Sequence, residues 1–383
     1  MKSSRKYVVL LVESSRTFGR QLVKGVVEYA NLRASWEIRR EPAGLEEMNS
    51  YKNRAPMDGI IAHVRNVKPA KRFIPKDKPA VVKGIGELVP GVCNIVGDTE
   101  AVGRMAAEHL RERGFKSFAY CGYREILWSR EFGSSFCNAL EGHGLPASLY
   151  FQSEARVKRL WREQIMQLAR WLGRLPKPIG IMACNDDHGQ HVIAACKFAG
   201  LRVPHDAAVI GVDNDAWICE LTSPPMTSVA LSIERAGYET AELLDRLMSG
   251  EPMKDQKIII RPTHIHVRRS TDVLSVEDPI LAAALSFIRV HVSNVLSVED
   301  VAAAVGQSRR LLERHFRTKL GRSIYKEIER VRVERACQLL GETNGSLKDI
   351  GRRCGFSSAA HFRTVFKRHT GLSPGQHRRV LRI

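Results

Sequence analysis

The chain has 383 residues, which is enough for two or three domains with a large core. It carries 60 Lys and Arg residues against 41 Asp and Glu residues, a net charge of +19, which suits a polyanionic partner. The apolar run behind the first six residues is too short for a signal peptide, and no run approaches membrane-spanning length. We therefore expect a cytoplasmic protein without a membrane partner.

The eight cysteines indicate buried thiols and not a metal centre or a disulfide framework. They form no CxxC pair, and no His/Cys cluster has the spacing of a zinc site. Most lie inside apolar runs, for example Tyr120-Cys121 and Ala195-Cys196, where a reduced cysteine behaves as a small apolar side chain.

The first 272 residues alternate between strand and helix patterns. Strands are expected at Tyr7 to Val12, Trp36 to Arg40, Asp58 to Val64, Ala80 to Val82, Ser117 to Cys121, Ile179 to Ala183 and Ala208 to Val212. Helices are expected at Phe18 to Leu32, Val102 to Arg113, Phe132 to Gly142, Val157 to Leu172 and Gly189 to Ala199. This alternation predicts parallel sheets with helices on both faces. No GxGxxG follows the first strand and no GxxxxGK[ST] occurs, so no cofactor is expected.

Polar residues follow several of the expected strands, at the carboxyl ends where α/β sheets bind ligands. They are Ser14, Ser15, Arg16, His63, Arg65, Asp98, Asn185, Asp186, Asp187, Asp213, Asn214 and Asp215. Carboxylates and amides that converge on a cleft suit a polyol, because each carboxylate accepts two hydroxyl hydrogen bonds. Any single one of these residues could equally cap the next helix or turn, whereas the whole set is harder to explain in that way.

Several segments of this region resemble the effector domain of LacI-type repressors, itself similar to periplasmic sugar-binding proteins. They are Asn94-Ile-Val-Gly-Asp98, Ala101 to Gly114, Arg130-Glu-Phe132, Ile181 to Asp186, Gly211-Val-Asp-Asn214 and Ser223 to Val229. The resemblance covers roughly Lys6 to Asp272. It implies two α/β lobes, joined by three crossovers, with an effector cleft between them.

The same resemblance implies which residues touch the effector. Arg130, Asp186 and Asp213 are the expected contacts, with Asn214 and Asp98 behind them. Trp128 or Trp217 could stack on the apolar face of a sugar, although either could also serve packing alone.

The stretch from Ser297 to Gly371 contains one pattern twice. Ser297-Val-Glu-Asp300 and Ser346-Leu-Lys-Asp349 each indicate a helix N-cap, followed by apolar residues at helical spacing. Each short helix stops at a glycine, and a second helix then begins at Ser308 or Ser358. Two short helices joined by a tight turn form a helix-turn-helix, so the chain has two such units.

The two units share a connector and a basic outer face. The segment Ile324 to Leu340 predicts a longer helix, and from Val276 onward the chain has 20 basic against 10 acidic residues. Residues expected in the core are Leu312, Phe316, Ile328, Val331, Ala336, Leu339, Phe362 and Phe366. The alternative is a helical bundle whose basic face is merely solvated.

These features resemble the DNA-binding domain of the AraC/XylS regulators over roughly Pro279 to Arg379. The second helix of each unit should enter the major groove, with its N-terminal half at the base edges. The expected DNA contacts are Arg309, Arg310, Glu313 and Arg314 in the first unit and Ala359, Ala360, His361 and Thr364 in the second, with Arg363 on phosphate.

The order of the two domains is informative, because LacI repressors carry their helix-turn-helix at the N-terminus. An effector domain over residues 1–272 followed by a DNA-binding domain over residues 273–383 resembles the xylose operon regulators, including the junction Arg268-Arg-Ser-Thr-Asp272. This resemblance implies a sugar-responsive, sequence-specific transcription regulator of carbohydrate catabolism, an activator whose effector is xylose or a related monosaccharide. Its implied partners are double-stranded operator DNA, a second copy of the chain and RNA polymerase.

Other classes of protein remain as alternatives. An enzyme could use the α/β cleft, although no nucleophile elbow, metal-ligand cluster or phosphate loop supports one. A transport-type binding protein, an effector-independent architectural DNA binder and a repressor responding to a different small molecule are the others.

Overall fold

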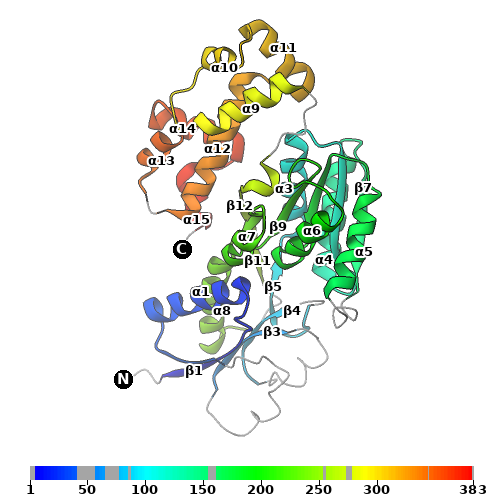
Figure 1. Cartoon of the computed structure of the whole chain (residues 1–383). Coiled ribbons are helices and arrows are strands. Elements are labelled where there is room, and N and C mark those ends of the chain that lie inside the picture. The colour runs from blue at the N-terminus through cyan, green and yellow to red at the C-terminus, as the bar shows by residue number, and fades with distance from the viewer. Residues whose placement is uncertain are drawn as a thin grey trace.

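The α/β region and the helical region of the sequence form separate parts of the structure. The computed structural model describes residues 5–40, 57–64, 77–84, 88–153, 161–252, 256–272, 278–343 and 345–381. Two α/β lobes carry a helical C-terminal domain (yellow to red in Figure 1), which lies beside the second lobe. The predicted fold class is therefore confirmed, including the all-helical domain with two helix-turn-helix units.

Each lobe is built on a six-stranded sheet. The first has the order β11-β5-β4-β3-β1-β2 and is parallel throughout, and the second has the order β12-β10-β9-β8-β6-β7, with only β12 antiparallel to its neighbour. The strands of the first lobe are β1 (Lys6–Leu11), β2 (Trp36–Arg40), β3 (Gly59–Val64), β4 (Ala80–Gly84), β5 (Cys93–Gly97) and β11 (Lys257–Ile260). Those of the second are β6 (Ser117–Tyr123), β7 (Ala147–Gln152), β8 (Ile179–Ala183), β9 (Ala207–Val212), β10 (Thr227–Leu231) and β12 (Pro262–His266).

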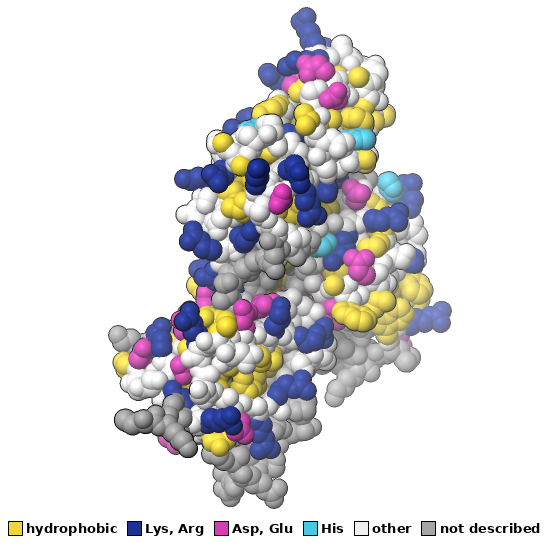
Figure 2. All heavy atoms as spheres, turned by 90° about the vertical axis from the view of Figure 1, so that its left-hand side faces the viewer, with side chains coloured by type: hydrophobic (Ala, Val, Ile, Leu, Met, Phe, Trp, Pro, Cys, Tyr) yellow, Lys and Arg dark blue, Asp and Glu magenta, His cyan; other side chains and the backbone are white. Residues whose placement is uncertain are grey.

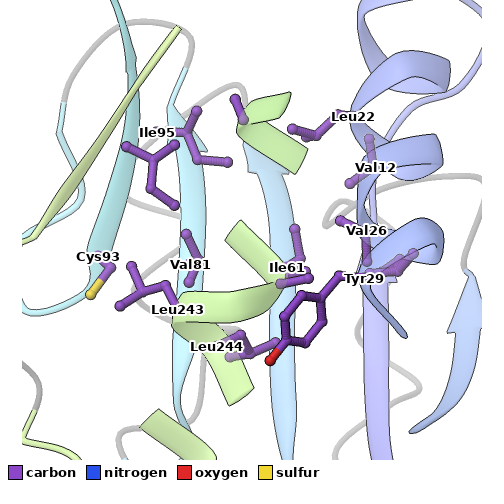
Figure 3. Close-up of a cluster of buried hydrophobic side chains, with 14 of the residues drawn as sticks. Val12, Leu22, Val26, Tyr29, Ile61, Val81, Cys93, Ile95, Leu243 and Leu244 are labelled. Carbon is purple, nitrogen blue, oxygen red and sulfur yellow. The ribbon is translucent and has the colours of Figure 1, made fainter. Parts of the chain in front are cut away.

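The first lobe is closed on one face by α1 (Thr17–Arg33) and α8 (Ile233–Met248). These helices cross at Gly25, where a β-carbon would lie 1.8 Å from the carbonyl oxygen of Glu234, so the close approach requires glycine. Figure 3 shows Leu22, Val26 and Tyr29 of α1 beside Leu243 and Leu244 of α8, over the strands. Burial of this apolar cluster fixes the helices on the sheet.

The second lobe has helices on both faces, as its continuous buried strands require. They are α3 (Thr99–Glu112), α4 (Leu127–Glu141), α5 (Trp161–Gly173), α6 (Asp186–Phe198) and α7 (Ala216–Leu221). One apolar cluster packs α3 and α4 against the sheet, and another packs α5 and α6 against the opposite face. Within the predicted helix Val157 to Leu172, residues 157–160 lie outside the described part of the chain.

The chain passes between the lobes three times, as the resemblance implied. The passages run from β5 to α3, from β10 to α8 and from β11 to β12. They lie side by side, because the Asp98 amide donates to the Ile260 carbonyl at 2.8 Å and the Ser232 amide donates to the Arg261 carbonyl at 2.8 Å. Three adjacent passages form a hinge between the two lobes.

The C-terminal domain contains two small cores bridged by one helix. Its helices are α9 (Pro279–His291), α10 (Val298–Ala304), α11 (Arg309–Leu320), α12 (Ile324–Glu342), α13 (Leu347–Arg353), α14 (Ala359–Thr370) and α15 (Pro374–Leu381). The predicted core phenylalanines Phe316, Phe362 and Phe366 and Leu312 are all fully buried. Ile328 and Val331 of α12 face the first core, whereas Ala336 and Leu339 face the second, so the connector serves both units.

Serine side chains begin the helices of both units as the sequence predicted. Ser297 forms a complete capping box with Asp300, and Ser346 accepts from the Asp349 amide at 3.1 Å. Ser308 and Ser358 cap α11 and α14 in the same way. Among the described residues, no helix is long and apolar enough to cross a bilayer, and all eight cysteines are free thiols.

Candidate functional site

A cavity of about 140 Å³ lies between the lobes and against their crossovers. The first lobe contributes Glu13, Arg16, Phe18, Gly19, His63 and Lys83. The second lobe contributes Trp128, Phe132, Cys184, Asn185 and Asp213, and the crossovers contribute Gly97, Thr99, Leu231 and Ile260. Aromatic and aliphatic walls that carry a few charged and amide groups are typical of a small-molecule site.

Asp213 reaches the cavity from a turn that directly follows β9. The turn holds Asp213 at φ 102° and Asn214 at φ 51°, the two non-glycine residues with positive φ in the described chain. Side-chain-bearing residues rarely adopt this conformation, and where they do it is often at a binding site. Burial and the neighbouring Asp186 and Asp187 carboxylates hold the pKa of Asp213 well above its usual range.

Lys83 is a cavity residue that sequence reasoning missed. It lies in β4, directly after the buried run Ala80–Val82, and its ammonium donates to the Gly84 carbonyl at 2.8 Å. Burial lowers the pKa of Lys83 to about 8, while the Glu131 and Asp213 carboxylates of the opposite lobe act to raise it. Its position could have indicated it, since Lys83 directly follows the predicted strand Ala80 to Val82, as other polar residues follow their predicted strands.

Contacts across the cleft hold the two lobes together beside this cavity. Arg16 forms an ion pair with Asp187 at 3.2 Å, and Arg20 lies 3.5 Å from the Asp215 carboxylate. Asp215 also accepts from the Thr17 amide at 3.2 Å, at the start of α1 in the other lobe. The first turn of α1 is thus capped by a carboxylate of the second lobe, which couples helix α1 to lobe closure.

Asp186 does not line the cavity, although the sequence predicted it as a contact. Its side chain is 1% exposed and accepts from the Ser228 hydroxyl and from the Asp215 amide, each at 2.6 Å. Burial raises its pKa to about 7 against the effect of these two donors. The geometry assigns Asp186 to holding the turn that presents Asp213.

Of the other predicted effector residues, Trp128 lines the cavity, whereas Asp98, Asn214, Arg130 and Trp217 do not. Asp98 caps α3 by accepting from the Ala101 amide at 3.1 Å, and Asn214 accepts from Arg268 at 3.0 Å. Arg130 is exposed and donates to the Arg124 carbonyl at 3.3 Å. Trp217 is 78% exposed.

Several strand-end residues do cap helices, which was the alternative explanation for them. Asn185 accepts from the His188 amide at 2.9 Å and starts α6, and Asp215 starts α7. Asn185 nevertheless also lines the cavity, so capping and lining are compatible in one residue. Arg65 lies outside the described residues.

The predicted DNA-contacting residues of the first unit lie on α11. Arg309, Arg310 and Arg314 are exposed, and Arg309 forms an ion pair with Glu299 of α10. Glu313 is half-buried and lies 3.7 Å from Arg317, one turn later. The helix therefore presents a row of arginines to solvent while its opposite face fills the first core.

The second unit presents a less charged helix, α14. Ala360, Arg363 and Thr364 are exposed, whereas Ala359 and His361 are partly buried. The imidazole Nε2 of His361 lies 3.4 Å from the hydroxyl of Tyr325 at the start of α12. In Figure 2, Lys and Arg side chains outnumber acidic ones over this face of the C-terminal domain.

Comparisons with known proteins agree with both domains. A family model described as a periplasmic binding protein-like domain matches residues 107–271, and one described as a helix-turn-helix domain matches residues 301–380. The transcriptional regulator CelR in complex with cellobiose covers 70% of the chain at 24% identity, with a TM-score of 0.57, and supports the fold of the α/β lobes.

Other relatives match nearly the whole length. The xylose operon regulatory protein of Haemophilus influenzae is 29% identical over 97% of both chains. Its namesake in Escherichia coli (strain K12) is 31% identical over 99% of this chain and 98% of that protein. A solved structure of the xylose-binding transcription activator XylR is 31% identical over 99% of both chains, with a TM-score of 0.63.

These whole-length relatives have both domains in the same order, and they are regulators of transcription and not enzymes. A cavity between two lobes and two helix-turn-helix units with exposed second helices, α11 and α14, are the parts that such a regulator requires. The chain is therefore a transcription regulator, and it belongs to the family of the xylose operon regulatory proteins.

Proposed function

We propose that the chain is a transcription activator switched by xylose or a closely related pentose. The observation that carries this proposal is the interlobe cavity, which lies at the hinge of a chain related over 99% of its length to a xylose-binding transcription activator. A ligand that contacts both lobes at a hinge stabilises the closed arrangement through its greater affinity for that state.

The proposed effector contacts come from both lobes. Asp213 accepts hydroxyl hydrogen bonds, while Lys83 and Arg16 donate them from the opposite lobe. Trp128 packs against the apolar face of the sugar ring. A neutral polyol suits this lining, which carries carboxyl groups that accept hydrogen bonds as well as cations that donate them.

Three of the sequence-predicted residues support this set rather than extend it. Asp186 and Asn214 hold the strained turn, and Asp98 fixes the start of α3. Arg130 is exposed on α4 and donates to the Arg124 carbonyl at 3.3 Å, and its contact with the sugar remains a prediction.

The proposed DNA contacts are exposed or partly buried residues in the N-terminal halves of α11 and α14. Arg309, Arg310, Glu313 and Arg314 read base edges in the first unit, with arginine on guanine and glutamate on cytosine. In the second unit Ala360, His361 and Thr364 face the bases and Arg363 binds phosphate. Because the two helices differ in sequence, one chain reads an asymmetric site with contact patches about one helical turn apart.

The proposed assembly is a homodimer that acts in the cytoplasm and contacts RNA polymerase at the promoter. The proposed domains are 1–272 for the effector and 273–383 for DNA. In support, η3 (Arg269–Thr271) follows the last strand of the α/β lobes, and Asp278 caps α9, the first helix of the helical part.

A thermal-shift screen of the full chain against a panel of aldoses tests the effector assignment. A ligand that binds only the folded state raises the melting temperature, by an amount that follows its concentration relative to Kd. We expect xylose to raise Tm more than glucose or galactose does at equal concentration. Stabilisation by a hexose or a phosphorylated sugar, with no effect of pentoses, would contradict the assignment.

A further inference from the structure

A series of part-buried and buried hydrogen bonds begins at the cavity turn and enters the domain junction. Asn214, next to Asp213, accepts from the Arg268 guanidinium at 3.0 Å. The amide of Arg268 donates to the Thr227 hydroxyl at 2.9 Å, and that hydroxyl contacts the Thr271 hydroxyl at 2.8 Å. The turn that carries a proposed effector contact is thus tied to the last described residues before the C-terminal domain.

The same series of hydrogen bonds continues into helix α3. His109 Nε2 lies 2.9 Å from the Thr271 hydroxyl, and Arg113 Nη1 lies 2.9 Å from His109 Nδ1. Since a guanidinium only donates, His109 Nδ1 accepts and its Nε2–H donates to Thr271. Thr271 can then donate to Thr227, so each of these hydroxyls and ring nitrogens has a defined role. Burial, with Arg113 next in effect, holds the pKa of His109 well below its usual range and keeps it neutral.

Arg113 extends this series of hydrogen bonds across the boundary between the domains. Its side chain is 1% exposed, its Nε donates to the Thr271 carbonyl at 3.1 Å, and its Nη2 donates to Glu334 of α12 at 3.1 Å. Arg330 of α12 bridges Glu334 and Glu112 of α3, at 3.1 Å each. A buried guanidinium that is satisfied only when both domains are present strongly penalises their separation.

Helix α3 provides a second, rigid connection between the same two places. It begins at the crossover with Thr99 in the cavity lining, and it ends at Glu112 beside α12. In Figure 1, α3 extends from the lobes toward the C-terminal domain. Helix α3 therefore connects the crossover with α12, the helix that contributes to both cores of the C-terminal domain.

We infer that Arg113 and Glu334 are positioning residues that transmit the state of the effector cavity to the two DNA-reading helices. The inference rests on the proposed function, because it takes the effector to act at Asp213. A ligand bonded to Asp213 favours one conformation of the strained turn. That conformation sets the positions of Arg268 and Thr271 and, through Arg113, the position of α12. Packed interfaces of this kind hold discrete arrangements instead of deforming continuously.

The test uses the full chain and two near-isosteric variants, Glu334→Gln and Thr271→Val. Glu334→Gln removes the charge that faces Arg113 and Arg330, and Thr271→Val removes the hydroxyl that contacts Thr227 and His109. Neither touches the cavity lining or the outer faces of α11 and α14. The DNA probe is a duplex selected from a random library by the wild-type chain. We measure the xylose Kd, the DNA Kd without sugar, and the ratio of DNA Kd values with and without saturating xylose.

We expect both variants to retain sugar binding and DNA binding, while the effect of xylose on DNA affinity falls by about 2- to 30-fold. Glu251→Gln is the matched control, because Glu251 forms an exposed ion pair with Arg246 within the effector domain. Wild-type coupling in both Glu334→Gln and Thr271→Val would overturn the inference.

A second measurement separates this inference from the sugar assignment. In the wild-type chain, the selected DNA should change amide hydrogen exchange of residues 213–215 without any sugar, and Thr271→Val should abolish that change. If xylose fails to bind the wild type but the exchange response follows this pattern, the proposed effector is wrong and the transmission route is correct. An exchange response that is equal in wild type and variant would refute the route.

Discussion

Asp213→Asn is the change that most directly probes the effector site. The substitution keeps the shape of the side chain and removes its charge, and asparagine tolerates positive φ better than most residues, so the turn at φ 102° should persist. A hydrogen bond to a charged group is worth about 1.5–3 kcal/mol. Burial already disfavours the Asp213 carboxylate, because it raises the pKa of this group well above its usual range. We therefore expect a loss near the lower end, about 1.5 kcal/mol.

We therefore expect Asp213→Asn to weaken xylose binding by about tenfold, which corresponds to roughly 1.4 kcal/mol. Isothermal titration calorimetry of the full chain measures this directly. Asp206→Asn is the matched control. Asp206 directly precedes β9, whereas Asp213 directly follows it, and Asp206 forms an ion pair with Arg202 at 2.8 Å, outside the cavity. An unchanged xylose Kd in Asp213→Asn, with a normal Tm, would refute the placement of the sugar.

Three further changes test other parts of the account. Burial raises the pKa of Asp186 from 3.8 to about 7, so the folded state retains a proton that the unfolded chain releases. Relative to Asp186→Asn, the wild type should therefore lose up to about 4 kcal/mol of unfolding free energy as pH rises from about 4 to about 7. Urea unfolding at several pH values measures this, and the same dependence of unfolding free energy on pH in both proteins would contradict it. Arg310→Ala should cost about 1–3 kcal/mol of DNA binding and relax base preference at one position, measured by fluorescence anisotropy with substituted duplexes; equal affinity for all duplexes would show that Arg310 does not read a base. Phe362→Ala removes a fully buried ring and should cost about 3–5 kcal/mol in urea unfolding, whereas a loss below about 1 kcal/mol would mean that the second core does not depend on it.

Much of the architecture could be predicted because local patterns carry it. The repeated serine caps, the helical apolar spacing and the glycine stops of the two reading units are local, and each appears in the structure. Edge strand β7 (Ala147–Gln152) was not predicted, because none of its residues is fully buried and its apolar pattern is weak. Strands β11 and β12 join different sheets, a long-range outcome that spacing along the chain does not reveal.

The candidate site was predicted only in part, because the type of a residue and its position in the sequence do not reveal the direction of its side chain. Asp186 and Asp213 both follow strands, yet Asp186 turns inward to Ser228 and Asp215 while Asp213 faces the cavity. Lys83 lay one residue beyond a predicted strand, and a systematic reading of every strand end would have found it. The interdomain contact of Arg113 with Glu334 depends on tertiary packing and has no local sequence signal.

We propose that the sugar cavity and helices α11 and α14 are coupled in one chain. The most direct test is to measure the xylose Kd with and without saturating selected DNA, and the DNA Kd with and without saturating xylose. Both ratios should differ from one and should be equal, because coupling between two binding sites is reciprocal. Tight xylose binding that leaves DNA affinity unchanged, with an equally unchanged xylose Kd in the presence of DNA, would contradict it.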